Sequence, residues 1–80
     1  MTINEKVSVE TTCDEKTKAL TPTKIVWRNR DYPVEKIGMH HTLRRGRELI
    51  HVFSLIANGN FFQLEFGTEG LVWVLTQMDS

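Results

Sequence analysis

Four short turn signals separate the apolar segments of residues 24–80, and they restrict the fold more than any other feature. The signals are Asn29–Asp31, Arg44–Arg47, Asn58-Gly59 and Gly67–Gly70. Asn58-Gly59 is the strongest of them, because both residue types accept the positive φ angles of a type I′ hairpin turn. A parallel connection needs a dozen or more residues, so the segments joined by these turns must pair antiparallel.

The segments between the turns are rich in β-branched and aromatic residues, which favour strands. The sequence predicts five strands, at residues 24–28, 32–43, 48–57, 61–66 and 71–78. Period-two alternation gives 61–66 one apolar face, whereas 48–57 is apolar on both faces. A flat sheet would leave an apolar face in water, so we expect an all-β fold. In it, a five- or six-stranded antiparallel meander curls into a small SH3-like barrel.

The strand expected at 32–43 changes phase partway along its length. Tyr32 and Val34 lie on one parity, and the later apolar residues lie on the other: Ile37, Met39 and Leu43. A bulge or sharp bend between Glu35 and Gly38 would return both sets to the core. The core is expected to rest mainly on Phe53, Leu55, Phe62, Leu64, Phe66, Trp73 and Leu75.

Residues 1–21 are polar and contain no aromatic side chain. This composition predicts a flexible leader that is mostly disordered, with at most a short strand at Val7–Val9. Pro22 disfavours a helical residue before it and marks the entry to the domain. The sequence therefore divides into a leader at 1–21 and a small barrel domain at 22–80.

Cys13 is the only cysteine, so an internal disulfide is excluded. The first residues lack the apolar core of a signal peptide, and no segment has the length of a membrane span. We therefore expect a cytoplasmic protein without membrane contact. Its oligomeric state is unknown from the sequence, and a monomer is favoured.

Three histidines raise the question of a metal site. His40 and His41 are adjacent, and neighbouring strand residues point to opposite faces, so a single ion cannot bind both without a bulge. His51 could join one of them across the strand pair, but two imidazoles are an incomplete zinc site. The sequence predicts no metal and no cofactor.

Catalytic motifs are not found either. Ser54 lies on the face opposite to His51, so the two cannot act as nucleophile and base. Paired carboxylates, phosphate-binding glycine loops and cofactor fingerprints are also missing from the sequence. We predict no enzymatic activity and no catalytic residue.

The charges are segregated although the net charge is zero. Residues 24–47 hold seven lysines and arginines against two carboxylates, and residues 48–80 hold four carboxylates and no lysine or arginine. The candidate residues for nucleic acid or another polyanion are Lys24, Arg28, Arg30, Lys36, Arg44, Arg45 and Arg47. Consecutive hairpin turns alternate ends, so we expect a stripe along 32–43. Trp27 and Tyr32 could stack on bases, but their strand positions favour the core.

A different interpretation is that the barrel is a protein-interaction or structural module, using an exposed edge strand or the face that carries Phe61. The sequence leaves a nucleic-acid partner and a protein partner both open. An affinity that falls steeply with salt would support the first hypothesis.

The residues of this domain resemble a family of uncharacterised small bacterial β-domain proteins with a Trp-Arg-x-Arg-x-Tyr-x-Val hairpin. The matching residues are Trp27, Arg28, Arg30, Tyr32, Val34, His40, His41, Trp73 and Leu75. Members usually have glycine at the position of Asn29. The resemblance covers 22–80 and implies a compact β domain of unknown function, with some members linked to DNA-damage-tolerance genes. It transfers no residue roles.

Overall fold

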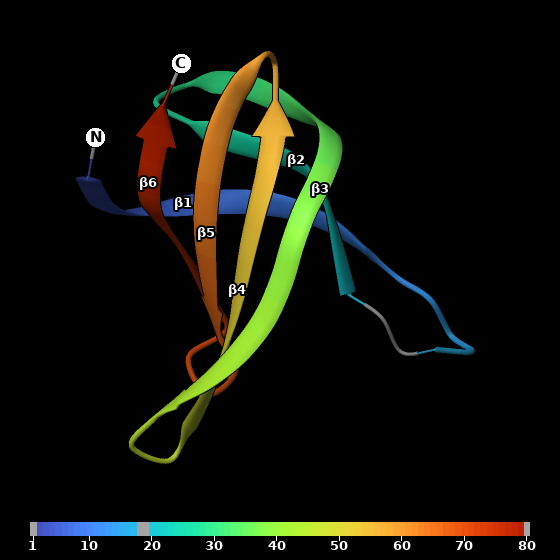
Figure 1. Cartoon of the computed structure of the whole chain (residues 1–80), viewed down its shortest axis with the longest axis vertical. Coiled ribbons are helices and arrows are strands. Elements are labelled where there is room, and N and C mark those ends of the chain that lie inside the picture. The colour runs from blue at the N-terminus through green and yellow to red at the C-terminus, as the bar shows by residue number, and fades with distance from the viewer. Residues whose placement is uncertain (1, 18–19, 80) are drawn as a thin grey trace.

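The computed structural model of this chain describes residues 2–17 and 20–79, and in these ranges it consists of strands and the turns that join them (Figure 1). The six strands are β1 (Thr2–Cys13), β2 (Leu20–Trp27), β3 (Arg30–Arg45), β4 (Glu48–Ala57), β5 (Asn60–Gly67) and β6 (Val72–Asp79). Each strand pairs antiparallel with its neighbour in the chain, and β1 also pairs with β6. The all-β antiparallel barrel expected from the sequence is therefore confirmed.

The hairpin turns follow backbone conformations that their residues permit. Asn58 and Gly59 have φ angles of 50° and 77°, as the predicted type I′ turn requires. Gly46 has a φ of 66° at the tip between β3 and β4, which confirms its place in that turn. The turn between β2 and β3 is centred on Arg28 and Asn29, with φ angles of 52° and 62°. It lies one residue earlier than predicted, because arginine gives no sequence signal for a positive φ.

The phase change in β3 arises from two irregularities in its pairing with β4. The register shifts between Val34 and Lys36 and again between Ile37 and Met39, leaving Glu35 and Gly38 as extra residues. The first bulge brings Ile37 back toward the core, as predicted. The second returns the following residues to the outer parity, so Met39 is 59% exposed rather than part of the core.

The N-terminal segment corrects the expectation of a mostly disordered leader. β1 covers Thr2–Cys13, pairs with β6 through its first half and with β2 through its second half, and closes the barrel. The predicted Val7–Val9 segment lies inside this longer strand. Ile3, Val7 and Val9 pack against the core, Glu5 shares their parity and is half-buried, and the residues at even positions between them are exposed. Only every second side chain of a strand faces the barrel interior, so β1 can contribute to the core with few apolar residues.

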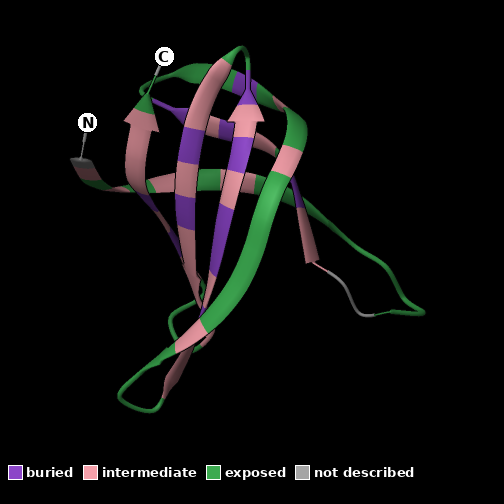
Figure 2. Ribbon diagram, viewed as in Figure 1, coloured by how far each residue is buried: buried purple, intermediate pink, exposed green. Residues whose placement is uncertain are grey.

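The core lies inside the barrel, and Figure 2 shows buried segments side by side on the neighbouring strands β4 and β5. Six of the seven predicted core residues are buried, and Phe66 is only partly buried at the rim. Trp27 and Tyr32 also belong to the core, with 8% and 7% of their surface exposed. Both rings pack on Phe62 in edge-to-face geometry, with centroids 6.4 and 5.1 Å away.

The hairpin of β3 and β4 extends beyond the barrel at the end opposite to the β2–β3 turn (Figure 1). β2 pairs with β3 only from Arg30 to Pro33, whereas β4 pairs with β3 out to Arg45. The outer part of β3 is thus held by β4 alone and carries a run of exposed residues from Gly38 to Thr42.

Candidate functional site

Three of the seven predicted polyanion-binding residues are already paired with carboxylates. The Lys24 ammonium lies 2.8 Å from Glu10 and 3.6 Å from Asp31, and the Arg45 guanidinium lies 3.2 Å from Glu65. Arg28 contacts Glu5 at 3.3 Å and lies over the Trp27 ring, 4.6 Å from its centroid. These cations have less charge to offer an external anion.

Glu5 connects β1 to the end of β2 and to the β2–β3 turn that follows it. It accepts a 2.8 Å hydrogen bond from the indole nitrogen of Trp27 and contacts from Arg28. The Trp27 hydrogen bond lowers the pKa of the Glu5 carboxyl; partial desolvation opposes this change, and Arg28 adds to it. The Glu5 carboxylate therefore links β1 to the β2–β3 turn.

The other four basic residues form no ion pair within the described part of the chain: Arg30, Lys36, Arg44 and Arg47. Arg30 begins β3, Lys36 lies in its middle, and Arg44 and Arg47 lie at the far tip. The two turns are thus at opposite ends of β3, as predicted (Figure 1). The unpaired cations do not form one compact patch, and only Arg44 and Arg47 are neighbours.

The face of the β3–β4 hairpin that continues the barrel interior carries an aromatic and histidine cluster. His40 pairs in register with Phe53, and its ring stacks on Phe53 with centroids 4.2 Å apart and planes inclined by only 3°. Phe53 is buried, whereas His40 remains exposed. One side of the imidazole therefore covers the core and the remainder meets solvent.

His51 extends this cluster across the strand pair. Its Nδ1 lies 2.9 Å from Nε2 of His40, so the two rings share one hydrogen bond whose direction depends on their tautomers. Phe66 packs beside His51 at 6.5 Å and against Trp73 at 4.7 Å between centroids. The rings form a continuous surface from the core to the exposed His40.

The charge state of His40 follows from these neighbours. Burial lowers the pKa of the His40 imidazole, and the nearby His51 and His41 lower it further. These neighbours therefore favour the neutral, stacking form of the His40 imidazole. Thr42 and Arg44 follow His40 at two-residue intervals on the same side of β3.

The opposite face of the hairpin has a different composition. His41 pairs in register with Val52, so it diverges from His40 as the sequence predicts. This outer face carries the ion pair of Arg45 with Glu65. It also carries Glu48, whose carboxylate accepts the backbone N–H groups of Glu69 and Gly70. The carboxylates of the hairpin thus lie away from the His40 face.

No group of three or more potential metal ligands occurs among the described residues. His40 and His51 meet as two imidazoles, which is the cross-strand pairing that the sequence suggested. His51 and Ser54 lie on opposite faces of β4, as their spacing requires. This cluster can stack and donate hydrogen bonds.

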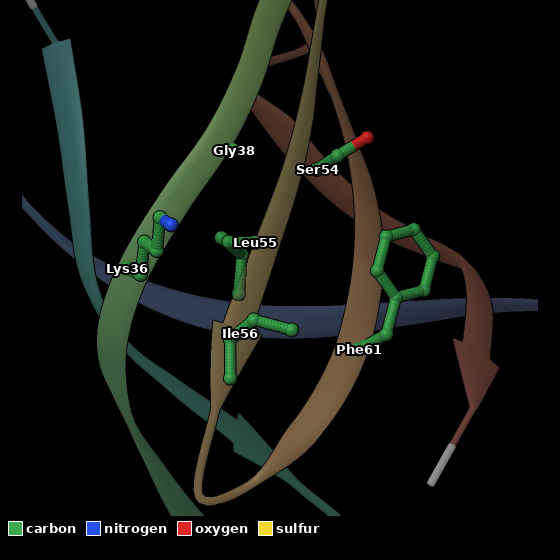
Figure 3. A pocket seen from close by; sticks show the side chains of 6 residues that line it. All are labelled: Lys36, Gly38, Ser54, Leu55, Ile56 and Phe61. Atoms are coloured by element: carbon green, nitrogen blue, oxygen red, sulfur yellow. The ribbon is translucent and has the colours of Figure 1, made fainter.

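A shallow groove of about 200 Å³ lies on the outer face of β3, β4 and β5 (Figure 3). It is lined by Lys36, Gly38, Ser54, Leu55, Ile56 and Phe61. Most of its lining is apolar, and Lys36 supplies the only charged group. The Phe61 face noted in the sequence is part of this groove.

The sequence did not reveal that β1 supplies carboxylates to the basic residues. Glu5 and Glu10 lay in the segment expected to be disordered, so Arg28 and Lys24 counted as free cations. The available signal was the occurrence of Ile3, Val7 and Val9 at odd positions. Extension of the predicted Val7–Val9 strand in both directions along this period would have brought Glu5 and Glu10 into β1.

No protein-family model, no curated protein and no solved structure matches the chain in our comparisons. The resemblance to small bacterial β-domain proteins therefore stays a prediction. Within the described residues, no helix has the length and apolar character needed to cross a membrane.

Proposed function

We propose that this protein is a non-catalytic, cytoplasmic nucleic-acid-binding barrel that holds a single strand on the His40 face of its β3–β4 hairpin. The observation that carries the proposal is the exposed His40 ring, stacked on Phe53 and followed on the same face by Arg44. An aromatic surface beside an unpaired guanidinium offers the two interactions by which proteins bind a single strand, which are base stacking and phosphate contact.

The distribution of charge supports this face over the rest of the basic stripe. Arg44 and Arg47 form no ion pair in the described residues, whereas Lys24, Arg28 and Arg45 each contact a carboxylate. Phosphate binding by a paired cation must first break or share that contact. We therefore assign the phosphate contacts to the hairpin tip.

The stacking surface favours a single strand over a duplex. Bases in a duplex already stack on one another and present only their edges, whereas unpaired bases expose their rings. The cluster offers a ring plane at His40, next to His51 and Phe66. It offers few groups suited to reading base edges.

The test measures fluorescence anisotropy of labelled 15-nucleotide single-stranded DNA, RNA and duplex DNA at 50 and 200 mM salt. We expect tighter binding of single strands, with affinity falling as salt rises. Absence of binding to every oligonucleotide at 50 mM salt would reject the proposal. A preference for the duplex would reject the stacking mode.

Two pairs of variants locate the site. Arg44→Ser combined with Arg47→Ser should reduce the magnitude of the logarithmic salt slope by about 1.4, because each phosphate contact contributes about 0.7 on a single strand. Lys24→Ser combined with Arg28→Ser removes the same charge from paired positions and should change the slope less. Melting curves check that each variant folds.

His40→Ala should weaken single-strand binding by about 1–3 kcal/mol, the usual contribution of one stacked base. His41→Ala is the matched control, because it removes the adjacent exposed imidazole from the opposite face of the same strand. Equal effects of the two substitutions would show that the His40 face is not the binding face.

A further inference from the structure

The edge of β3 that faces away from β4 has no partner strand along most of its length. β2 pairs with β3 only from Arg30 to Pro33, and no described strand pairs with this edge from Val34 to Arg45. Figure 2 shows the exposed run along this part of β3. The barrel therefore closes through a short contact and leaves a long free edge beside it.

The two bulges divide the free edge into a distorted part and a regular part. Glu35 and Gly38 interrupt the ladder with β4, whereas Met39–Arg45 pair with Ser54–Glu48 without a further shift. Bulges prevent strand addition next to them, and a regular exposed stretch provides a template for it. The regular stretch is thus the part of the edge open to another strand.

The charges of the side chains along this edge favour an acidic added strand over a basic one. Lys36 and Arg44 form no ion pair in the described residues, and β3 has no carboxylate after Glu35. The Glu35 carboxylate itself accepts the N–H of Gly59 at 2.7 Å. Antiparallel pairing of two copies through this edge would place basic residues near one another, which is unfavourable. An acidic strand would instead gain opposite charges.

The two faces of β3 further define such a strand. His40 and Arg44 lie on one face, and the apolar Met39 and Leu43 lie on the other. Met39 is 59% exposed, so an added strand could cover it. Side chains of an added strand alternate in the same way, with acidic groups beside Arg44 and apolar groups beside Met39.

We propose that the free edge of β3 between Met39 and Arg45 binds an extended acidic segment of a partner protein as an additional strand. The segment alternates acidic and apolar residues. This interaction rests on main-chain hydrogen bonds of the edge, and it shares only the Arg44 side chain with the proposed nucleic-acid face.

The test uses the full chain and a capped nine-residue peptide of alternating glutamate and valine, N-methylated at every second residue. This methylation leaves the peptide one hydrogen-bonding edge. Amide exchange followed by NMR should slow at least tenfold at alternate residues of Met39–Arg45, because only every second N–H points away from β4. The amides that face β4 should not change.

Two control peptides separate the contributions. N-methylation of every residue removes all amide donors and should abolish the alternating protection. Replacement of the glutamates by lysine should abolish binding through charge repulsion. Failure of the glutamate peptide to slow alternate amides would overturn the proposal, as would alternating protection that develops with protein concentration in the absence of peptide. The latter would identify a second copy as the occupant.

Arg44→Glu should weaken peptide binding about 3–10-fold, from the loss of an exposed ion pair and the gain of a repulsion. Lys16→Glu is the matched control, because it makes the same charge change on the connection between β1 and β2. Equal weakening by both variants would overturn the assignment to this edge. The exchange pattern distinguishes this proposal from nucleic-acid binding, since phosphate contacts by side chains produce no alternating amide protection.

Discussion

The two ends of β3 carry similar numbers of basic residues, but these residues differ in whether a carboxylate lies beside them. At the β2–β3 end, Arg28 and Lys24 contact carboxylates contributed by β1, and Arg28 also covers Trp27. At the β3–β4 tip, Arg45 contacts Glu65, whereas Arg44 and Arg47 project from a part of the hairpin that no other described strand covers. Closure of the barrel thus brings carboxylates to two of the three basic residues at the first end, leaving Arg30, and only one cation is paired at the tip. Most of the basic residues therefore stabilise the fold at one end, and most are available for binding at the other.

The largest expected effect concerns the core at the end of the barrel that carries the β2–β3 turn, here called the closed end. Phe62 is fully buried and packs edge to face against both Trp27 and Tyr32. Phe62→Ala should lower the free energy of unfolding by about 3–5 kcal/mol, most of the stability of a small domain. Urea denaturation measures this loss.

Phe66 provides the comparison, because it is an equivalent ring at the hairpin end that remains partly exposed. Phe66→Ala should cost less than Phe62→Ala, since part of its surface is already in water. A larger loss for Phe66→Ala would show that the hairpin end, rather than the closed end, holds most of the fold.

Acidification should affect the hairpin end through His40. Its pKa is lowered in the folded state, so the unfolded chain takes up a proton more readily. His40 therefore contributes stability above the ordinary histidine pKa of 6.5, and this contribution is lost as pH falls below that value. Thermal melts between pH 7.5 and 5 should show decreasing stability.

His40→Gln keeps a polar side chain without the titration and should flatten this dependence. His41→Gln, on the opposite face, serves as its control. An unchanged slope in His40→Gln would assign the pH effect to another group.

Removal of one carboxylate should make a paired cation behave like the free ones. Glu65→Gln releases Arg45 from its 3.2 Å contact on the outer face of the hairpin. If the bound strand passes around the hairpin tip to the outer face, the variant should bind more tightly at low salt, with a salt slope steeper by up to about 0.7. An unchanged slope would confine the strand to the His40 face. Anisotropy titrations at several salt concentrations measure the slope.

Glu69→Gln is the charge-matched control, because Glu69 is an exposed carboxylate in the β5–β6 turn and forms no ion pair with any described residue. An equal gain in both variants would indicate a general effect of net charge and not the release of Arg45.

The sequence predicted the features that depend on local patterns. The Asn58-Gly59 turn, the divergence of His40 and His41, and the bulge before Gly38 follow from residue type and period two. The positions of β3, β4, β5 and β6 were predicted within a few residues for the same reason.

The features that depend on closure of the barrel were not predictable in this way. The pairing of β1 with β6 recruits a polar segment whose own composition indicates disorder, and it carries Glu5 and Glu10 to distant cations. The hydrogen bond between His40 and His51 is, by contrast, a local feature: it lies in the part of the hairpin whose register runs without a shift from the Gly46 turn, and the sequence had suggested a contact across this strand pair. The sequence suggested one irregularity in β3. The structure has a second one, at Gly38, and this second bulge leaves the Met39 side chain exposed.

The smallest expected effect concerns the strain at the closed end. Arg28 adopts a φ of 52°, a conformation that costs a non-glycine residue about 1 kcal/mol and that asparagine tolerates better. Arg28→Asn relieves this cost but removes the contacts with Glu5 and Trp27, so its net effect on stability should be near zero. In the Glu5→Gln background one of those contacts is already weakened, and the same substitution should stabilise by about 0.5 kcal/mol. A double-mutant cycle in urea measures the difference. If Arg28→Asn destabilises equally in both backgrounds, the contact with Glu5 contributes nothing to the closed end, and the difference between the two ends of β3 is one of position and not of pairing.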